Sequence, residues 1–320
     1  LSEGSLIASV ATRGSSGDAG RVTMSADRLT LTEDATVQTS TRGLGDAGDV
    51  RIAATEISLS DGGGFLSNAE GLAGGRSGSV SVAADSLAIG AGGLVETTSL
   101  NPNPAGAISI VGRSVTVDGA GGHVSSENLS SAGGPAGSIS IAGEVIRIAN
   151  GGLVSTNSTA GRAGDITLSL PSDGFLFLTG EDAPGVITTS SGPGTGGRIT
   201  IGEPYAVISD NGRILALGQA GGANVAIQSQ FFIRSADRLN LVSVDGSLVI
   251  DSQIDNVSSG VAAPDVSFLD ASSVLRGQCP PARLGGAASQ LSLRALGPLS
   301  ARPAAGEAGA GGPAPGSACR

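Results

Sequence analysis

A short glycine motif recurs through most of this 320-residue chain at a nearly constant spacing. Each copy has a small residue, a glycine, a variable residue and then an apolar–polar–apolar triplet, as in residues 47–52 (Ala-Gly-Asp-Val-Arg-Ile). Subtracting successive glycine numbers gives steps of 28, 30, 28, 31, 27 and 33 residues. Such variation is typical of repeats that share a core and differ in loop length. The motif glycines are Gly20, Gly48, Gly78, Gly106, Gly137, Gly164 and Gly197, with a degenerate eighth at Gly222.

Each repeat, of about 28–31 residues, holds three short stretches in which apolar and polar residues alternate. The first stretch is the triplet after the glycine. The second has the form of residues 29–31 (Leu-Thr-Leu), and the third that of residues 95–97 (Val-Glu-Thr). Alternation with a period of two predicts a strand with one buried face. Clusters of Gly, Asp, Asn and Ser separate the stretches and predict turns.

Three short strands cannot bury their apolar faces alone, but stacked repeats can, with like residues over like. The sequence therefore predicts an all-β fold, a parallel β-helix with three short strands per turn over residues 1–250. An α-helical fold would need an i, i+3, i+4 apolar pattern, which residues 1–260 lack. An antiparallel sandwich does not explain why three strand types return in the same order. The expected inner ladder is Val22, Val50, Val80, Ile108, Ile139, Ile166 and Ile199.

Hydroxyl residues occupy equivalent places in the third strand, two residues after an inward aliphatic residue. We expect them to point inward and to hydrogen-bond to one another and to nearby backbone. An outward threonine array would instead indicate an ice-binding face, but the outward positions carry mixed residues such as Gln38, Glu96 and Ser125. The expected hydroxyl ladder is Thr39, Thr97, Ser126, Thr156 and Thr189.

The charge pattern argues against nucleic acid as a partner. The 18 basic residues, all of them arginine, are spread among 28 acidic residues, and the formal net charge is −10. Nucleic-acid binding needs a concentrated basic stripe instead. No apolar run approaches the roughly 20 residues of a membrane-spanning helix, so we do not expect the chain to span a membrane. Residues 5–10 match a third strand, so we expect the chain to be the C-terminal piece of a longer protein with any export signal upstream.

The last part of the chain departs from the repeats. We expect a terminal cap or closing segment at residues 251–296. An Ala/Gly/Pro-rich disordered tail is expected at residues 297–320, because that composition cannot offset the entropy of ordering. Most phenylalanines also occur late in the chain. We interpret them as cap material over the last turn in preference to a ligand platform. They are Phe175, Phe177, Phe231, Phe232 and Phe268.

Cys279 and Cys319 are the two cysteines of the chain. An even pair in an exported protein indicates a disulfide, whose purpose next to a disordered tail would be tethering more than stabilisation. Two free thiols are the other interpretation.

Beyond the repeats, a closing block runs from residues 245–250 (Asp-Gly-Ser-Leu-Val-Ile) through residues 268–276 (Phe-Leu-Asp-Ala-Ser-Ser-Val-Leu-Arg) to Cys279. Together with the Ala-Gly-x-Ile-x-Ile units it resembles the C-terminal region of filamentous haemagglutinin-type exoproteins of two-partner secretion systems. The resemblance covers nearly the whole chain. It implies a right-handed β-helical shaft, export through an outer-membrane β-barrel transporter to the cell surface, and a role in adhesion, aggregation or biofilm formation. In some such adhesins a C-terminal cysteine pair holds the protein at its transporter, and the pair Cys279 and Cys319 is similar.

A parallel β-helix can also carry a polysaccharide lyase or glycosidase, which needs clustered carboxylates or a Ca²⁺ site on one outer face. Asp18, Asp46 and Asp49 fall near one corner of adjacent turns, but carboxylates beside glycine more often serve in turns. His123, the sole histidine, is expected to face solvent without metal-ligand partners. We therefore expect a non-catalytic adhesin shaft and anchor with no metal or cofactor, whose receptor the sequence does not name. The alternatives are a β-helical carbohydrate-active enzyme and a haemolysin or toxin of the same secretion class.

Overall fold

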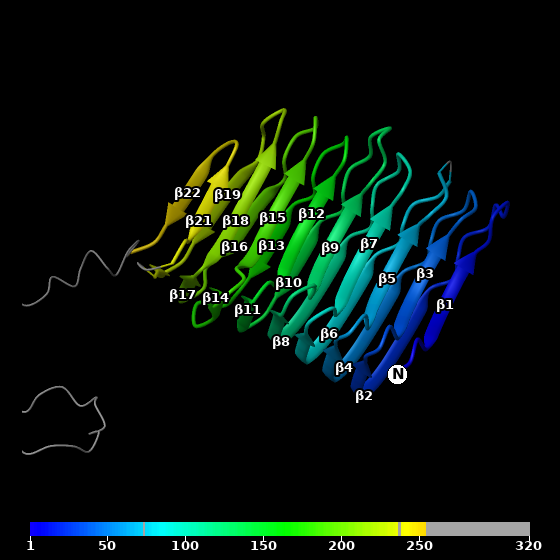
Figure 1. The fold of residues 1–320 in the computed structure, drawn as a ribbon, viewed down its shortest axis with the longest axis horizontal. Coiled ribbons are helices and arrows are strands. Elements are labelled where there is room, and N and C mark those ends of the chain that lie inside the picture. Colours follow the sequence, from blue (N-terminus) through cyan, green and yellow to red (C-terminus); the bar gives the residue numbers. More distant parts are fainter. Residues whose placement is uncertain (73, 236–237, 254–320) are drawn as a thin grey trace, which may run out of the picture. The chain divides into compact units, whose positions relative to one another are not determined.

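The computed structural model describes residues 1–72, 74–235 and 238–253. The chain divides into two units, Leu1–Pro264 and Asp265–Arg320, and the second unit lies outside the described residues. The expected closing segment beyond residue 253, the tail at residues 297–320, Phe268 and the pair Cys279 and Cys319 therefore lie outside them as well. Every regular element of the described residues is a β-strand (Figure 1).

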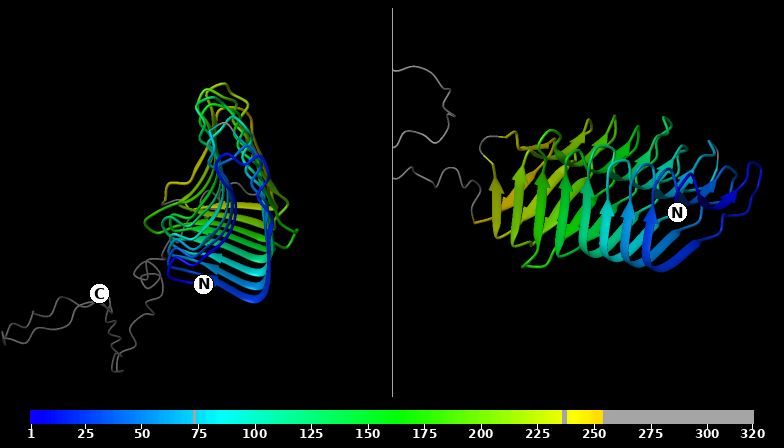
Figure 2. Two further views of the ribbon diagram at one scale, coloured as in Figure 1. Left: turned by 90° about the vertical axis from the view of Figure 1, so that its right-hand side faces the viewer. Right: turned by 60° about the horizontal axis from the view of Figure 1, so that its bottom comes forward.

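The strands stack as a parallel β-helix of about eight turns, as the sequence predicts (Figure 2). Each complete turn contributes its third strand to a nine-stranded sheet and its first and second strands to a 13-stranded sheet. Strands of neighbouring turns pair in parallel throughout, for example β4 with β6 and β5 with β7. The third strands are β1 (Leu6–Ala11), β3 (Thr36–Thr41), β5 (Gly64–Ala69), β7 (Leu94–Ser99), β9 (His123–Asn128), β12 (Leu153–Ser158), β15 (Gly185–Ser191), β18 (Gly212–Gly218) and β21 (Leu241–Val244).

The first and second strands differ from the expectation in the early turns, where they run on as one bent strand. The in-register pairing skips one residue, Thr55 in β4, and resumes at Glu56, so the strand continues in the same sheet. In later turns Pro171 and Pro204 fall at this corner, and proline cannot donate to the ladder. The continuous strands are β2 (Val22–Leu31), β4 (Val50–Leu59), β6 (Val80–Ile89) and β8 (Ile108–Asp118). The separate first strands are β10 (Ile139–Ala142), β13 (Ile166–Ser169), β16 (Arg198–Gly202), β19 (Asn224–Gln228) and β22 (Leu248–Asp251). The separate second strands are β11 (Val145–Ala149), β14 (Phe175–Thr179), β17 (Ala206–Asp210) and β20 (Phe231–Arg234).

The inner ladder predicted from the glycine motif is confirmed. Val50 pairs in register with Val22 on one side and with Val80 on the other, and the register continues through Ile108 and the later members to Ile199. All of these side chains except Val22 are at most 1% exposed. The core is therefore a column of aliphatic rows whose burial drives the stacking of the turns.

The inward hydroxyl row is also confirmed, and it bonds to the motif glycines. Its five predicted members are fully buried. Thr97 Oγ1 donates to the carbonyl of Gly106 at 2.7 Å and lies 2.9 Å from Ser126 Oγ, and Thr156 Oγ1 donates to the carbonyl of Gly164 at 2.8 Å. The hydroxyls thereby satisfy carbonyl groups at the corner where one turn begins.

The motif glycines are required by close packing between turns. A Cβ atom on Gly106, Gly137, Gly164 or Gly197 would lie 1.9 Å from the carbonyl oxygen of the motif glycine one turn earlier. No side chain can occupy that space. The recurrence of glycine in the sequence therefore records a backbone contact that every turn repeats.

The turn between the second and third strands uses left-handed backbone in most repeats. Asp34, Asp61, Asn150 and Asn211 have φ angles of 60°, 49°, 50° and 65°. Asp and Asn tolerate this conformation better than other residues with side chains. The turns also stack, since the Asp34 N–H donates to the Asp61 carbonyl at 2.8 Å. The polar turn residues are thus also stacked from one repeat to the next, outside the aliphatic core.

Candidate functional site

The three carboxylates considered for catalysis lie in one corner, where they hold loops. Asp18 Oδ1 accepts from the Asp46 N–H at 2.8 Å, and Asp46 Oδ1 accepts from the Arg76 N–H at 2.7 Å. Asp49 Oδ1 accepts from the Ser79 N–H at 3.1 Å. Each carboxylate therefore binds the backbone of the next turn, which is the turn chemistry that the sequence favours.

His123 faces outward from β9, but its surroundings differ from the expectation. Its side chain is 26% exposed, and its Nε2 lies 3.7 Å from Glu96 Oε2 on the neighbouring strand β7. The interaction with the Glu96 carboxylate raises the pKa of His123 above its ordinary value, and burial opposes this. The same interaction lowers the pKa of Glu96, whereas burial raises the pKa of nearby Glu127. Residues 27 positions apart in sequence meet because the third strands of successive turns pair.

Three of the late phenylalanines, Phe175, Phe177 and Phe231, do not form the end cap that the sequence led us to expect. In β14, Leu176 and Leu178 are fully buried, so alternation places Phe175 and Phe177 on the outer face. Phe231 likewise lies outward on β20, whereas Phe232 points into the core and is 1% exposed. Three of these rings therefore line the flank of the late turns. The alternation of Phe with Leu in residues 175–178 could have indicated this from the sequence.

These outward rings form a continuous cluster with Tyr205, which the sequence analysis did not single out. The Phe175 ring lies 6.1 Å from Phe177 and 5.6 Å from Tyr205, centroid to centroid. The Tyr205 ring lies 5.2 Å from Phe231 in an edge-to-face arrangement. Tyr205 is 41% exposed, and the three phenylalanines are half-buried. We call Phe175, Phe177, Tyr205 and Phe231 the aromatic ledge.

A polar hollow of about 410 Å³ lies at the corner that leads into the ledge. Its lining carries two carboxylates, Glu203 and Asp251, and amide and hydroxyl side chains including Gln228, Ser229 and Gln230. The buried Ser229 Oγ has no hydrogen-bond partner among the described residues. We call this the corner hollow. Its amide and hydroxyl side chains place hydrogen-bond donors and acceptors beside the apolar surface of the ledge.

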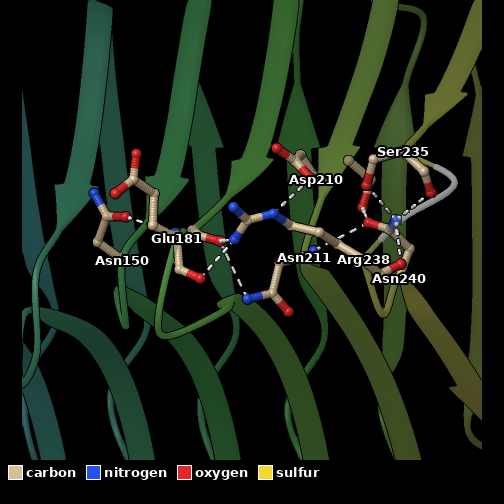
Figure 3. A network of polar contacts seen from close by, with 10 residues as sticks. Asn150, Glu181, Asp210, Asn211, Ser235, Arg238 and Asn240 are labelled. Carbon is tan, nitrogen blue, oxygen red and sulfur yellow. Dashed lines mark hydrogen bonds and ion pairs between the residues drawn. The ribbon is translucent and has the colours of Figure 1, made fainter. Parts of the chain in front are cut away.

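A second polar site, at the corner between the second and third strands of the late turns, serves to clamp turns together (Figure 3). Arg238 Nη1 donates to the carbonyls of Gly180 at 3.0 Å and Glu181 at 2.6 Å, and its Nε lies 3.6 Å from Asp210 Oδ1. Asn211 Nδ2 donates to the same Gly180 carbonyl at 3.1 Å. Arg238 is thus engaged by backbone and carboxylate groups from earlier turns. The network fixes the last turns against the body of the stack.

Among the described residues, no group of three or more His, Cys, Asp or Glu side chains could hold a metal ion. The same residues include no helix that could span a membrane.

Comparison with known proteins leaves the family open. No protein-family model matches the chain, and no curated protein matches it. One solved structure that matches is described as a crystal structure of the TibC-catalysed hyper-glycosylated TibA55-350 fragment. It is 14% identical and covers 79% of this chain and 99% of its own, with a TM-score of 0.15.

Proposed function

We propose that the chain is the non-catalytic shaft and C-terminal anchor region of a large surface adhesin exported by two-partner secretion. One observation carries the proposal: the pairing of one turn is repeated by the next, so a continuous ladder runs from β1 to β21 in one sheet. A stack of this kind lengthens by about 4.8 Å per turn without a new fold for each addition. It is suited to mechanical reach and to the display of surface residues in rows.

The direct contacts of the candidate carboxylates support a non-catalytic role. Asp46 and Asp49 each accept a backbone N–H from the following turn. Their conversion to Asn keeps an acceptor at each position and removes the charge that acid–base catalysis would need. Absence of polysaccharide turnover by the unchanged protein and by the Asp46→Asn and Asp49→Asn variants supports the proposal. Polysaccharide turnover that both substitutions abolish would establish the enzyme alternative instead.

The proposal is tested on cells that produce the protein at its natural length. An antibody against the solenoid should label intact cells, and labelling should disappear when the gene of the partner transporter is deleted. Attachment or aggregation of those cells should fall with it. Protein that stays inside cells with an intact transporter contradicts the proposal, and lysis of erythrocytes by the exported protein would favour the haemolysin alternative.

A further inference from the structure

We infer that the aromatic ledge and the corner hollow together form a binding site for a neutral polysaccharide. The inference rests on the proposed function and names the class of partner for it. The two parts are joined by the chain itself. Phe175 follows hollow-lining Ser172 by three residues, Tyr205 follows Glu203 by two, and Phe231 directly follows Gln230.

The site has the two surfaces that a sugar ring requires. A pyranose presents C–H groups on its faces and hydroxyls around its edge. The C–H groups are attracted to the negative face of an aromatic ring, and the ledge offers rings with centroids 5.2 to 6.1 Å apart. The hydroxyls need donors and acceptors beside that surface, and Gln228 and Gln230 at the hollow supply both.

The buried hydroxyl of Ser229 is an independent indication of a polar ligand. It lines the hollow, and its Oγ lacks a partner among the described residues. Buried hydroxyls in folded proteins almost always have a hydrogen-bond partner. A saccharide hydroxyl in the hollow would provide one.

The charges at the hollow favour a neutral chain over an anionic one, and Arg147, the in-register neighbour of Phe177, is paired with Asp118 at 3.8 Å. The hollow is lined by two carboxylates, Glu203 and Asp251, and by no basic side chain among the described residues. Single-stranded nucleic acid also stacks on aromatic rings, but it needs a positively charged groove to follow its backbone. Sulfated or carboxylated polysaccharides are disfavoured for the same reason.

The size of the ledge favours a sugar chain over a protein partner. An aromatic side chain covers about 150–250 Å² when it is fully buried. Because three of the four ledge rings are half-buried and Tyr205 is 41% exposed, their combined accessible surface is roughly 300 Å². A stable protein interface needs about 800 Å² from each partner. A few sugar units in line would cover the ledge.

The test is affinity electrophoresis of the full 320-residue chain in gels that contain hydroxyethylcellulose, mixed-linkage β-glucan, galactomannan or dextran, with heparin and alginate as anionic polymers. We expect at least one neutral polymer to retard the chain. The Tyr205→Ala/Phe177→Ala double variant should bind it about tenfold more weakly, because a few central residues, often aromatic, carry most of the binding free energy of an interface. Tyr205→Phe, which keeps the ring, should retain most of the binding, and Gln230→Ala should weaken it less than the double variant. Val111→Ala is the matched control, because Val111 is apolar and 55% exposed on β8, outside the ledge.

Three binding results would overturn the inference: no neutral polymer retards the chain, only heparin or alginate does, or Tyr205→Ala/Phe177→Ala binds as tightly as the unchanged protein. If sedimentation shows that the unchanged chain is a dimer and that the same double variant is a monomer, the ledge is the contact surface for a second copy of the chain. Circular dichroism of each variant shows that it is folded. If the double variant loses polysaccharide binding while cells that carry it still attach and aggregate, the adhesin proposal stands without this site.

Discussion

The early and late turns share one inner face and carry two different outer faces. On the second strand, inward positions are aliphatic and buried in both regions, for example Ile57 and Leu176. The outward positions next to them differ. In the early turns Arg28 and Glu56 form an exposed ion pair at 2.7 Å, whereas in the late turns the same row carries Phe175. Stacking therefore constrains the inside of each turn and leaves the outside free to specialise.

This division separates stability from recognition along the whole molecule. The inner rows must match from turn to turn, since each contacts its neighbours across about 4.8 Å. An outer row can change from polar to aromatic within a few turns without disturbing the pairing, as the continuous register from β11 to β20 shows. Substitutions at inner positions should therefore have similar effects in both regions.

The largest effect is expected at the motif glycines. Gly106→Ala in an early turn and Gly164→Ala in a later one each place a Cβ 1.9 Å from a carbonyl oxygen of the preceding turn. Overpacking of this kind should lower the free energy of unfolding by about 3 kcal/mol, measured by urea denaturation followed by circular dichroism. Gly17→Ala is the matched control, because a Cβ there meets nothing within 4 Å. A late variant that unfolds like the unchanged protein would break the claim of a common inner face.

Neighbouring positions of β14 test the inner and outer faces directly. Leu176 is fully buried, so Leu176→Ala should cost about 3 kcal/mol of stability in the same denaturation experiment. Phe177 is half-buried on the ledge, and Phe177→Ala should cost about 1 kcal/mol or less. Equal losses at the two positions would mean that the ledge belongs to the core, and the separation of stability from recognition would fail in the late turns.

The sequence predicted the inside of the molecule well because like residues recur there at one period. The aliphatic ladder from Val50 to Ile199 and the hydroxyl row follow from that recurrence alone. On the outer face, residue types do not recur at a fixed period. The rings of Tyr205 and Phe231 lie 5.2 Å apart because loop lengths bring them to one flank, and an isolated residue in the sequence does not indicate such a contact. The contact of His123 with Glu96 was missed for the same reason, since it joins two different turns.

The third effect concerns the hydroxyl row. Thr156→Val keeps the approximate shape of the side chain but removes the hydrogen bond to the Gly164 carbonyl. Because that carbonyl lies in a buried environment, the substitution should cost about 1.5 kcal/mol, read from the shift of the denaturation midpoint at constant slope. Thr188→Val is the control, since Thr188 lies on the outer face of β15 and should change stability by about 0.5 kcal/mol or less. If both variants behave alike, the inner hydroxyls contribute packing alone.

The smallest effect is a pH dependence on the outer face of β7 and β9. The groups around His123 are Glu96, Glu127 and the Gly121 carbonyl. Since folding raises the pKa of His123, its contribution is fully present below its ordinary value of 6.5 and is lost as the pH rises through the raised value. Since folding lowers the pKa of Glu96, its contribution is present above 4.5 and is lost as the pH falls through the lowered value.

Relative to the unchanged protein, His123→Gln should therefore lower stability by about 0.5 kcal/mol near pH 5.5, and by nearly nothing at about pH 9, where the histidine is neutral in both states. Denaturation curves at the two pH values measure the difference. Burial raises the pKa of Glu127, which also makes stability fall as the pH rises, so the comparison is repeated in a Glu127→Gln background to separate the two groups. A loss of equal size at both pH values would mean that His123 acts through packing, and that the outer face of the early turns carries no electrostatic pair of consequence.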